Sequence, residues 1–142
     1  MKHLVVVAHP AVGSFTMALA REYAAELETL GHSQRTLNLD RMGFNPVLTA
    51  EELSPAADHP PSVAKAQEAV RTADALTFIY PLWWLSMPAM MKGYVDRVFA
   101  RGFAYESPGR RRARTALRKK VESGCCASAD QSRLGSGLQA DH

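Results

Sequence analysis

Residues 78–105 read FIYPLWWLSMPAMMKGYVDRVFARGFAY, an apolar strand pattern, an aromatic loop and a helical pattern in immediate succession. The run from Leu76 to Tyr80 is short and apolar, which predicts a strand buried on both faces. Pro81 has no N–H for a sheet ladder, so we expect the strand to end at Tyr80. Pro88 can take the first position of a helix, and apolar residues then recur at three- and four-residue spacing: Met90, Met91, Tyr94, Val95, Val98 and Phe99.

Two tryptophans, Trp83 and Trp84, occupy the loop between this strand and this helix. The loop that leaves the carboxyl end of a parallel strand is where open α/β sheets bind ligands. Large flat side chains there suit a flat ligand, although loop tryptophans are also common as core or subunit-contact residues. The segment taken alone leaves both interpretations open.

The amino terminus predicts a second unit made of a strand, a loop and a helix. His3–Ala8 is an apolar run suited to a central parallel strand. Phe15–Leu30 has helical periodicity and is followed by Gly31; its apolar positions are Phe15, Leu19, Tyr23, Leu27 and Leu30. The loop between them, residues 9–14, is short and contains Gly and Ser. Because the first N–H groups of a helix lack internal partners and its dipole favours an anion, this arrangement predicts a phosphate site.

Residues of this first loop also have ordinary structural interpretations. His9 can cap the strand end by a hydrogen bond to the backbone, Ser14 can be the helix N-cap, and Phe15 can belong to the core. A capping hydroxyl can also bind phosphate, and Thr16 can add a second hydroxyl. The loop lacks the glycine spacing of a dinucleotide fingerprint and the lysine of a Walker loop.

Together the two segments resemble the flavodoxin-like NAD(P)H:quinone oxidoreductase family over about residues 1–106. The resemblance rests on residues 81–105 and on a His-x-x-x-x-Ser-Phe pattern at His9, Ser14 and Phe15. It implies that the first loop meets the flavin phosphate and that the loop after the third strand wraps the isoalloxazine ring. The implied cofactor-binding residues are His9, Ser14, Phe15, Thr16, Pro81, Leu82, Trp83, Trp84 and Leu85.

The segments between these landmarks complete an α/β pattern. His32–Leu39 predicts a second strand, Thr49–Pro61 a polar surface excursion that begins with a helical turn, and Val63–Ala73 the helix before strand three. Alternating strands and helices indicate a parallel sheet with right-handed crossovers. The resemblance implies a flavodoxin-like three-layer αβα sandwich with strand order 2-1-3, in which the last two strands of the family are missing or altered.

Composition changes abruptly after Glu106. All eleven aromatic residues lie in residues 1–106, where 9 Lys/Arg face 11 Asp/Glu, whereas residues 107–142 hold 8 Lys/Arg and 3 Asp/Glu. We expect a flavin-binding domain over 1–106 and a basic, atypical tail over 107–142. The tail can be a solvated segment, an end altered by truncation or a reading-frame shift, or an electrostatic patch. Nucleic-acid binding by the run RRRARTALRKK at 110–120 is disfavoured, because no aromatic residues interleave with the charges.

The resemblance implies a flavin-dependent NAD(P)H:quinone oxidoreductase that uses FAD or FMN. In that family a nicotinamide delivers hydride to the flavin and leaves, and a quinone or similar small aromatic acceptor then takes the electrons in a ping-pong cycle. No side chain need be a nucleophile, so no catalytic residue is assigned. The expected substrate slot consists of Trp84 with Phe103 and Tyr105, the latter two from the neighbouring subunit of a homodimer.

Two other functions stay open. One is a truncated, catalytically deficient subunit that acts by binding, for example as the regulatory partner of a membrane transporter. The other is a nonenzymatic electron carrier.

Charged and sulfur-bearing residues add little to the functional hypothesis. Lys92, Asp96 and Arg97 predict a solvated helical face or dimer contacts, with Lys92 and Asp96 as an i,i+4 pair. Cys125 and Cys126 are adjacent, which matches neither a zinc site nor a Cys-x-x-Cys motif, so no metal is expected. No signal peptide precedes the first strand and no apolar run approaches about 20 residues, so we expect a cytoplasmic protein.

Overall fold

A computed structural model of the chain describes residues 1–54, 59–105 and 120–126. Its elements from β1 to α3 follow the predicted alternation of strands and helices, with ends that differ from the predicted ones by two residues at most. In chain order they are β1 (Lys2–Val7), α1 (Phe15–Thr29), β2 (Ser33–Asn38), the 3-10 turn η1 (Glu51–Leu53), α2 (Pro61–Thr72), β3 (Ala75–Pro81), α3 (Ala89–Val98) and β4 (Lys120–Cys126).

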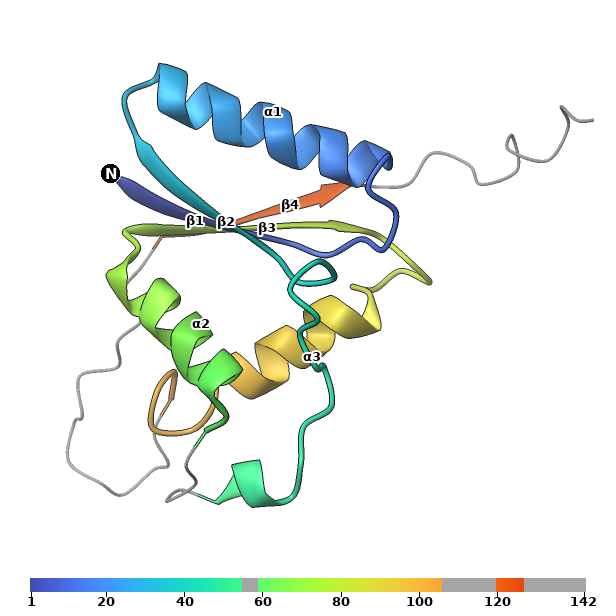
Figure 1. The fold of residues 1–142 in the computed structure, drawn as a ribbon, viewed down its shortest axis with the longest axis vertical. Coiled ribbons are helices and arrows are strands. Elements are labelled where there is room, and N and C mark those ends of the chain that lie inside the picture. The colour runs from blue at the N-terminus through green and yellow to red at the C-terminus, as the bar shows by residue number, and fades with distance from the viewer. Residues whose placement is uncertain (55–58, 106–119, 127–142) are drawn as a thin grey trace, which may run out of the picture.

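The strands form one parallel sheet in the order β2-β1-β3-β4 (Figure 1). The predicted order 2-1-3 is confirmed, and a fourth strand extends it beyond β3. β4 pairs with β3 from Ala75↔Lys120 to Pro81↔Cys126, inside the segment that composition assigned to a tail. The edge of β3 is therefore paired with a further strand rather than open. Composition could not reveal β4, because a parallel ladder is built from backbone groups that every non-proline residue carries.

Helices cover both faces of the sheet, which confirms the three-layer sandwich. α1 lies on one face, and α2 and α3 lie on the other (Figure 1). Alternate residues of β1 enter two separate cores: Val5 and Val7 pack on the α1 side, whereas Leu4 and Val6 pack on the side of α2 and α3. This alternation is the period-2 geometry of a strand buried on both faces.

α1 packs on the sheet through only part of the apolar face predicted for it. Its buried residues are Thr16, Met17, Ala20, Ala24 and Leu27. Phe15 is 71% exposed and Leu19 is 37% exposed, so the core interpretation of Phe15 is wrong. The helical period was predicted correctly, but the buried face also includes Met17, Ala20 and Ala24, which the prediction left out.

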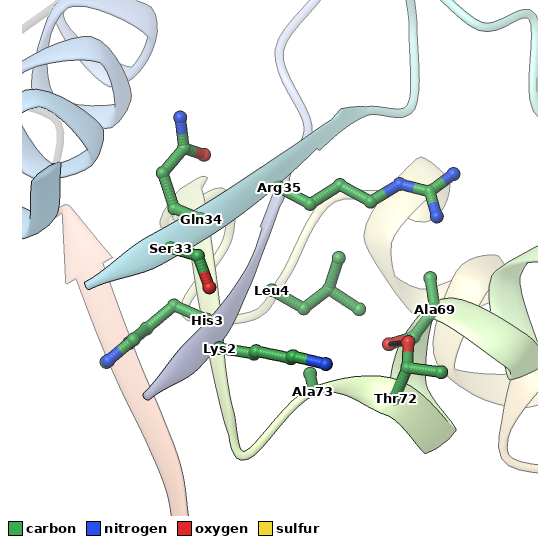
Figure 2. Close-up of a pocket in the computed structure, with 9 residues that line it drawn as sticks. All are labelled: Lys2, His3, Leu4, Ser33, Gln34, Arg35, Ala69, Thr72 and Ala73. Carbon is green, nitrogen blue, oxygen red and sulfur yellow. Dashed lines mark hydrogen bonds between the residues drawn. The ribbon is translucent and has the colours of Figure 1, made fainter.

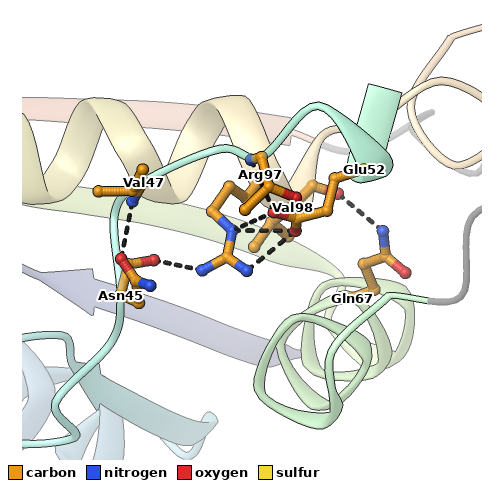
Figure 3. Close-up of polar contacts among 7 residues, drawn as sticks. Asn45, Val47, Glu52, Gln67, Arg97 and Val98 are labelled. Atoms are coloured by element: carbon orange, nitrogen blue, oxygen red, sulfur yellow. Dashed lines mark hydrogen bonds and ion pairs between the residues drawn. The ribbon is translucent and has the colours of Figure 1, made fainter. Parts of the chain in front are cut away.

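Arg97 and Glu52 form a buried ion pair that attaches the excursion after β2 to α3. Their side chains are each 4% exposed, and Arg97 Nη2 lies 2.9 Å from Glu52 Oε1. Arg97 also donates to the carbonyl of Asn45, and the amide of Gln67 donates to Val98 O at 3.2 Å (Figure 3). The expectation that Arg97 lies on a solvated face is therefore wrong, and the excursion is not purely superficial.

The charged state of Glu52 depends on this pair. Burial of Glu52 opposes ionisation, but hydrogen bonds from Arg97 and from Thr49 N–H, together with the charge of Arg97, outweigh it and lower the pKa of Glu52. By contrast, Lys92 and Asp96 form the predicted exposed i,i+4 pair, with Lys92 Nζ 2.6 Å from Asp96 Oδ2.

Candidate functional site

The two predicted cofactor loops lie at the same edge of the sheet. The strand order reverses at β1 and β3, because β2 lies to one side of β1 while β3 and β4 lie to the other. Open α/β sheets bind ligands at the carboxyl ends of strands at such a switch point. The loop after β1 and the loop after β3 leave together at the right of Figure 1.

A direct ring contact joins these loops. The imidazole of His9 and the indole of Trp83 pack edge to face, with ring centroids 5.8 Å apart and planes inclined at 62°. The structure therefore brings together His9, from the loop predicted to bind the flavin phosphate, and Trp83, from the loop predicted to wrap the flavin ring. The two residues are 74 positions apart in the chain. Spacing in the sequence contains no information about this contact.

The first loop is organised around the start of α1. His9 Nδ1 accepts a hydrogen bond from Ala11 N–H at 3.0 Å, and Ser14 N–H donates to Ala11 O at 3.2 Å. Ser14 is the N-cap of α1, and its Oγ accepts from Met17 N–H at 3.3 Å. The structural roles predicted for His9 and Ser14 are thus confirmed.

Unpaired donors remain at this helix start. Among the described residues, the N–H groups of Phe15 and Thr16 have no hydrogen-bond partner, and no acidic residue lies in the first turn of α1. An anion is favoured at such a position by the helix dipole and by these free N–H groups. Thr16 itself is 4% exposed, so the predicted contact of its hydroxyl with a phosphate is the least accessible of the set.

The second loop is a tight turn with an unusual backbone. β3 ends at the buried Pro81, one residue later than predicted, because the last residue of a strand need not donate to the ladder. Trp83 and Ser86 then exchange two backbone hydrogen bonds, each 3.0 Å. The central residues Trp84 and Leu85 have φ angles of 50° and 58°.

Positive φ at both central residues defines a type I′ turn, which normally contains Asn-Gly. Trp84 and Leu85 both carry a β-carbon, so each pays a conformational cost of about 1 kcal/mol or more. Trp84 is 99% exposed and Leu85 is 91% exposed, so neither gains burial in return. The core interpretation of Trp84 is therefore wrong, and an exposed, strained apolar turn of this kind indicates a binding surface.

Charged residues are absent from the two cofactor loops. Residues 9–16 and 81–88 contain no Asp, Glu, Lys or Arg. Val12 and Phe15 of the first loop are 74% and 71% exposed and add apolar surface near the start of α1. The site therefore offers backbone donors and one imidazole to an anion, and apolar side chains to a flat ring.

Phe103 and Tyr105 do not join Trp84 within one chain. Phe103 packs against the core beneath Arg71, whose guanidinium carbon lies 5.6 Å from the centre of the ring. Arg71 lies in the last turn of α2, just before β3 begins, whereas Trp84 follows the other end of β3. A substrate slot that contains all three side chains would need a second copy of the chain, as the prediction supposed.

Two cavities lined by described residues lie away from this edge. One of about 150 Å³ lies at the amino ends of β1 and β2, beside Lys2, Arg35 and Thr72 (Figure 2). The other, of about 320 Å³, lies between α1 and β2. Neither of these two cavities is lined by a predicted cofactor residue.

Besides β4 and the buried face of α1, the sequence interpretation missed two features of the molecule. The buried Arg97 was recognisable, because it falls three residues after Tyr94 on the apolar face of α3. The left-handed turn at Trp84 and Leu85 had no sequence signal, since neither residue favours that conformation.

Other predictions lie partly outside the described residues. The basic run at 110–120 lies outside them, except for Lys120 at the start of β4, and Cys125 and Cys126 end that strand. No helix of the described segments is long and apolar enough to cross a bilayer. Within those same segments, no three His, Cys, Asp or Glu residues gather into a metal site.

Comparison with known proteins gives an independent result. The family model described as a flavodoxin-like fold matches residues 1–135, well past Glu106, where the resemblance was expected to stop. A Haemophilus influenzae protein named "Uncharacterized NAD(P)H oxidoreductase" is 39% identical over 110 residues, which cover 75% of this chain and 54% of that protein. The Mus musculus "Ribosyldihydronicotinamide dehydrogenase [quinone]" is 32% identical over 127 residues, which cover 76% of this chain and 55% of that protein.

A solved structure extends the likeness to the fold. The NAD(P)H:quinone oxidoreductase from Methanothermobacter marburgensis matches with a TM-score of 0.79 and 32% identity, over 94% of this chain and 68% of that one. The chain spans about half the length of the curated relatives it matches. From the fold, the family model and these identities, the chain belongs to the flavodoxin-like NAD(P)H:quinone oxidoreductase family.

Proposed function

We propose that this chain is a flavin-dependent oxidoreductase that transfers electrons from NAD(P)H to a quinone or a similar aromatic acceptor. One observation carries the proposal: the free helix start after β1 and the exposed Trp84–Leu85 turn after β3 lie at the same edge of the sheet. The names of the relatives supply the substrate class, since they include NAD(P)H oxidoreductases and quinone dehydrogenases.

The residues at this edge fit the two chemically different ends of a flavin. The N–H groups of Phe15 and Thr16 and the hydroxyl of Ser14 suit a phosphate. A β-carbon added at Gly13 would meet nothing within 4 Å, so the loop leaves room for a ligand. Trp84 and Leu85 offer a broad apolar surface, which suits a tricyclic ring.

A bound flavin would supply the redox chemistry, by accepting a hydride from NAD(P)H and giving two electrons to the acceptor. The chain itself would bind the phosphate at the start of α1 and hold one side of the ring with the Trp83–Ser86 turn. No carboxylate or ammonium group lies in either loop, so donor and acceptor would bind by stacking rather than by an ion pair there. Sequential use of one open ring face favours a ping-pong order.

A second function follows from the openness of the site. The described residues leave the ring surface uncovered, and the chain spans about half the length of its curated relatives. A chain that holds flavin without turning over would then act as a binding or regulatory subunit. An electron carrier is a third function, and it would need a separate reductase to become reduced.

The test is flavin retention followed by reduction. The purified 142-residue chain is mixed with FMN or FAD, freed of unbound flavin, and given NADPH and then NADH without oxygen. We expect retained flavin whose visible absorption is bleached directly, and reoxidation by a quinone. Retained flavin without bleaching would favour the binding subunit or the carrier, and no retained flavin would refute the proposal.

Matched variants locate the site. Ser14→Ala and Trp84→Ala should weaken flavin binding, because they remove a phosphate donor and the apolar ring surface. Leu53→Ala is the control: Leu53 is 67% exposed, but it belongs to η1 rather than to either cofactor loop. Equal effects of Leu53→Ala and Trp84→Ala would contradict the proposed location.

A further inference from the structure

The imidazole of His9 is held from two sides. Its Nδ1 accepts a hydrogen bond from Ala11 N–H at 3.0 Å, and its ring packs edge to face on Trp83 at 5.8 Å. The first contact comes from its own loop and the second from the loop after β3. His9 is therefore oriented by a residue that lies in the other half of the candidate site.

These contacts favour one tautomer of His9. Ala11 O lies 3.2 Å from Nδ1. The Ala11 N–H, which can only donate, lies closer to Nδ1, at 3.0 Å, so Nδ1 is assigned as the acceptor. The neutral ring then carries its hydrogen on Nε2, which leaves Nε2–H as the donor for a ligand.

We propose that Trp83 is a positioning residue for phosphate recognition, which holds the His9 ring so that Nε2–H donates to the phosphate of a phosphorylated flavin. The inference rests on the proposed function, and it gives the indole of Trp83 a role distinct from contact with the flavin ring. If this is so, Trp83, a residue of the loop after β3, sets the preference of the protein for phosphorylated over unphosphorylated flavin.

The position of Trp83 suits this role because its own backbone is fixed. Trp83 N–H and O each bond to Ser86 at 3.0 Å, so the indole is attached to a closed turn rather than to a free loop. An edge-to-face aromatic pair favours the paired arrangement of its two rings over unpaired ones by a factor of about 2 to 10. Loss of the indole should therefore lower the contribution of the phosphate to flavin affinity by about that factor.

The experiment compares riboflavin with FMN, which differ only by the phosphate. For each variant, the ratio of the dissociation constant for riboflavin to that for FMN measures the phosphate contribution. Trp83→Leu should lower the ratio about 2- to 10-fold, and His9→Gln should lower it at least as much. The double variant should lower it no further than His9→Gln alone, because Trp83 acts through His9.

Trp84→Leu is the matched control. Trp84 is 99% exposed and follows Trp83 in the same turn, so its loss should weaken riboflavin and FMN equally and leave the ratio unchanged. Trp83→Phe keeps an aromatic edge against His9 and should preserve the ratio. An unchanged ratio in Trp83→Leu, or independent effects of the His9 and Trp83 changes, would overturn the inference while leaving flavin binding intact.

A second measurement needs no flavin. Nitrogen-15 NMR of the imidazole in the flavin-free protein should show His9 as the Nε2–H tautomer. Observation of the Nδ1–H tautomer would overturn the inference directly. If the wild-type chain binds neither riboflavin nor FMN, the proposed function fails and the role of Trp83 fails with it. An unchanged ratio in a chain that still binds flavin overturns the role of Trp83 alone, so the two failures are distinguishable.

Discussion

The strained turn after β3 leads to a prediction opposite to the usual effect of mutation. Replacement of Trp84 and Leu85 by Asn and Gly should stabilise the fold, because these residues accept the left-handed backbone that the turn requires. The two φ angles, 50° and 58°, lie in a region that costs a residue with a β-carbon about 1–2 kcal/mol. Removal of this conformational cost at both positions should therefore raise the free energy of unfolding by about 3 kcal/mol.

Two corrections decide the net effect. Glycine at position 85 gives the unfolded chain more freedom, which removes about 1 kcal/mol of the gain. No burial is lost, because Trp84 is 99% exposed and Leu85 is 91% exposed. The net stabilisation is about 2 kcal/mol, which corresponds to a rise in Tm of about 8 °C for a chain of this size.

The assay is urea unfolding of the flavin-free protein, followed by circular dichroism. Flavin must be absent because its binding would stabilise the wild type selectively. Val12→Asn is the control: Val12 is 74% exposed but has no positive φ, so its change should alter stability by less than about 0.5 kcal/mol.

Either of two results would refute the strain argument: no gain in W84N/L85G, or an equal gain in V12N. The stabilised variant should also bind flavin more weakly than the wild type, since it has lost the apolar surface of the turn. Gain of stability with loss of binding would identify the turn as a place where the protein gives up stability for function.

Three further predictions concern α3 and its contacts. Gly93→Ala should destabilise the protein by about 2 kcal/mol or more, because the added β-carbon would collide with the carbonyl oxygen of Pro46. This cost exceeds the gain from the better helix propensity of alanine, and urea unfolding will measure it. Tyr94→Phe should be neutral or stabilising by about 1 kcal/mol in the same assay, because the buried Tyr94 hydroxyl has no hydrogen-bond partner among the described residues and burial raises its pKa. Glu52→Gln should cost about 3 kcal/mol at neutral pH by leaving Arg97 buried without its charge partner. Folding lowers the pKa of Glu52 below its ordinary value of 4.5. The wild type should therefore be more stable than Glu52→Gln at pH values above 4.5, and should lose this extra stability as the pH falls through the pKa of Glu52 in the folded protein. Unfolding curves at several pH values will measure this.

Matched substitutions separate these effects from general disruption. Tyr23→Phe should cost about 1 kcal/mol, because the Tyr23 hydroxyl bonds to Thr77 Oγ1 at 3.1 Å. Asp96→Asn removes an exposed ion pair with Lys92 and should cost at most about 0.5 kcal/mol. A loss in Tyr94→Phe as large as that in Tyr23→Phe, or equal losses in Asp96→Asn and Glu52→Gln, would contradict the burial arguments.

Local patterns were sufficient for most of the architecture. The elements and their order along the chain could be read from neighbouring residues, because the signals are short-range. These signals are the apolar runs of β1 and β3, the N-cap at Ser14, and the helix-end residues Gly31 and Pro88. The loops followed from the same reasoning, because a ligand edge is implied once parallel strands are placed side by side. β4 was missed since its residues lie in a basic segment that gives a weak strand pattern.

The amino-acid sequence by itself determined the elements from β1 to α3, the parallel sense of their strands and the two loops that meet at one edge, whereas the order 2-1-3 came from the family resemblance. Only the tertiary structure decided which residues of α1 are buried, that Arg97 pairs with Glu52, and that His9 packs on Trp83. The physical reason is that periodicity and capping act within a few residues, whereas burial and ring contacts depend on partners far away in the chain. The backbone of Trp84 and Leu85 belongs to the second group, because a turn closed by its neighbours imposes a conformation that neither residue prefers.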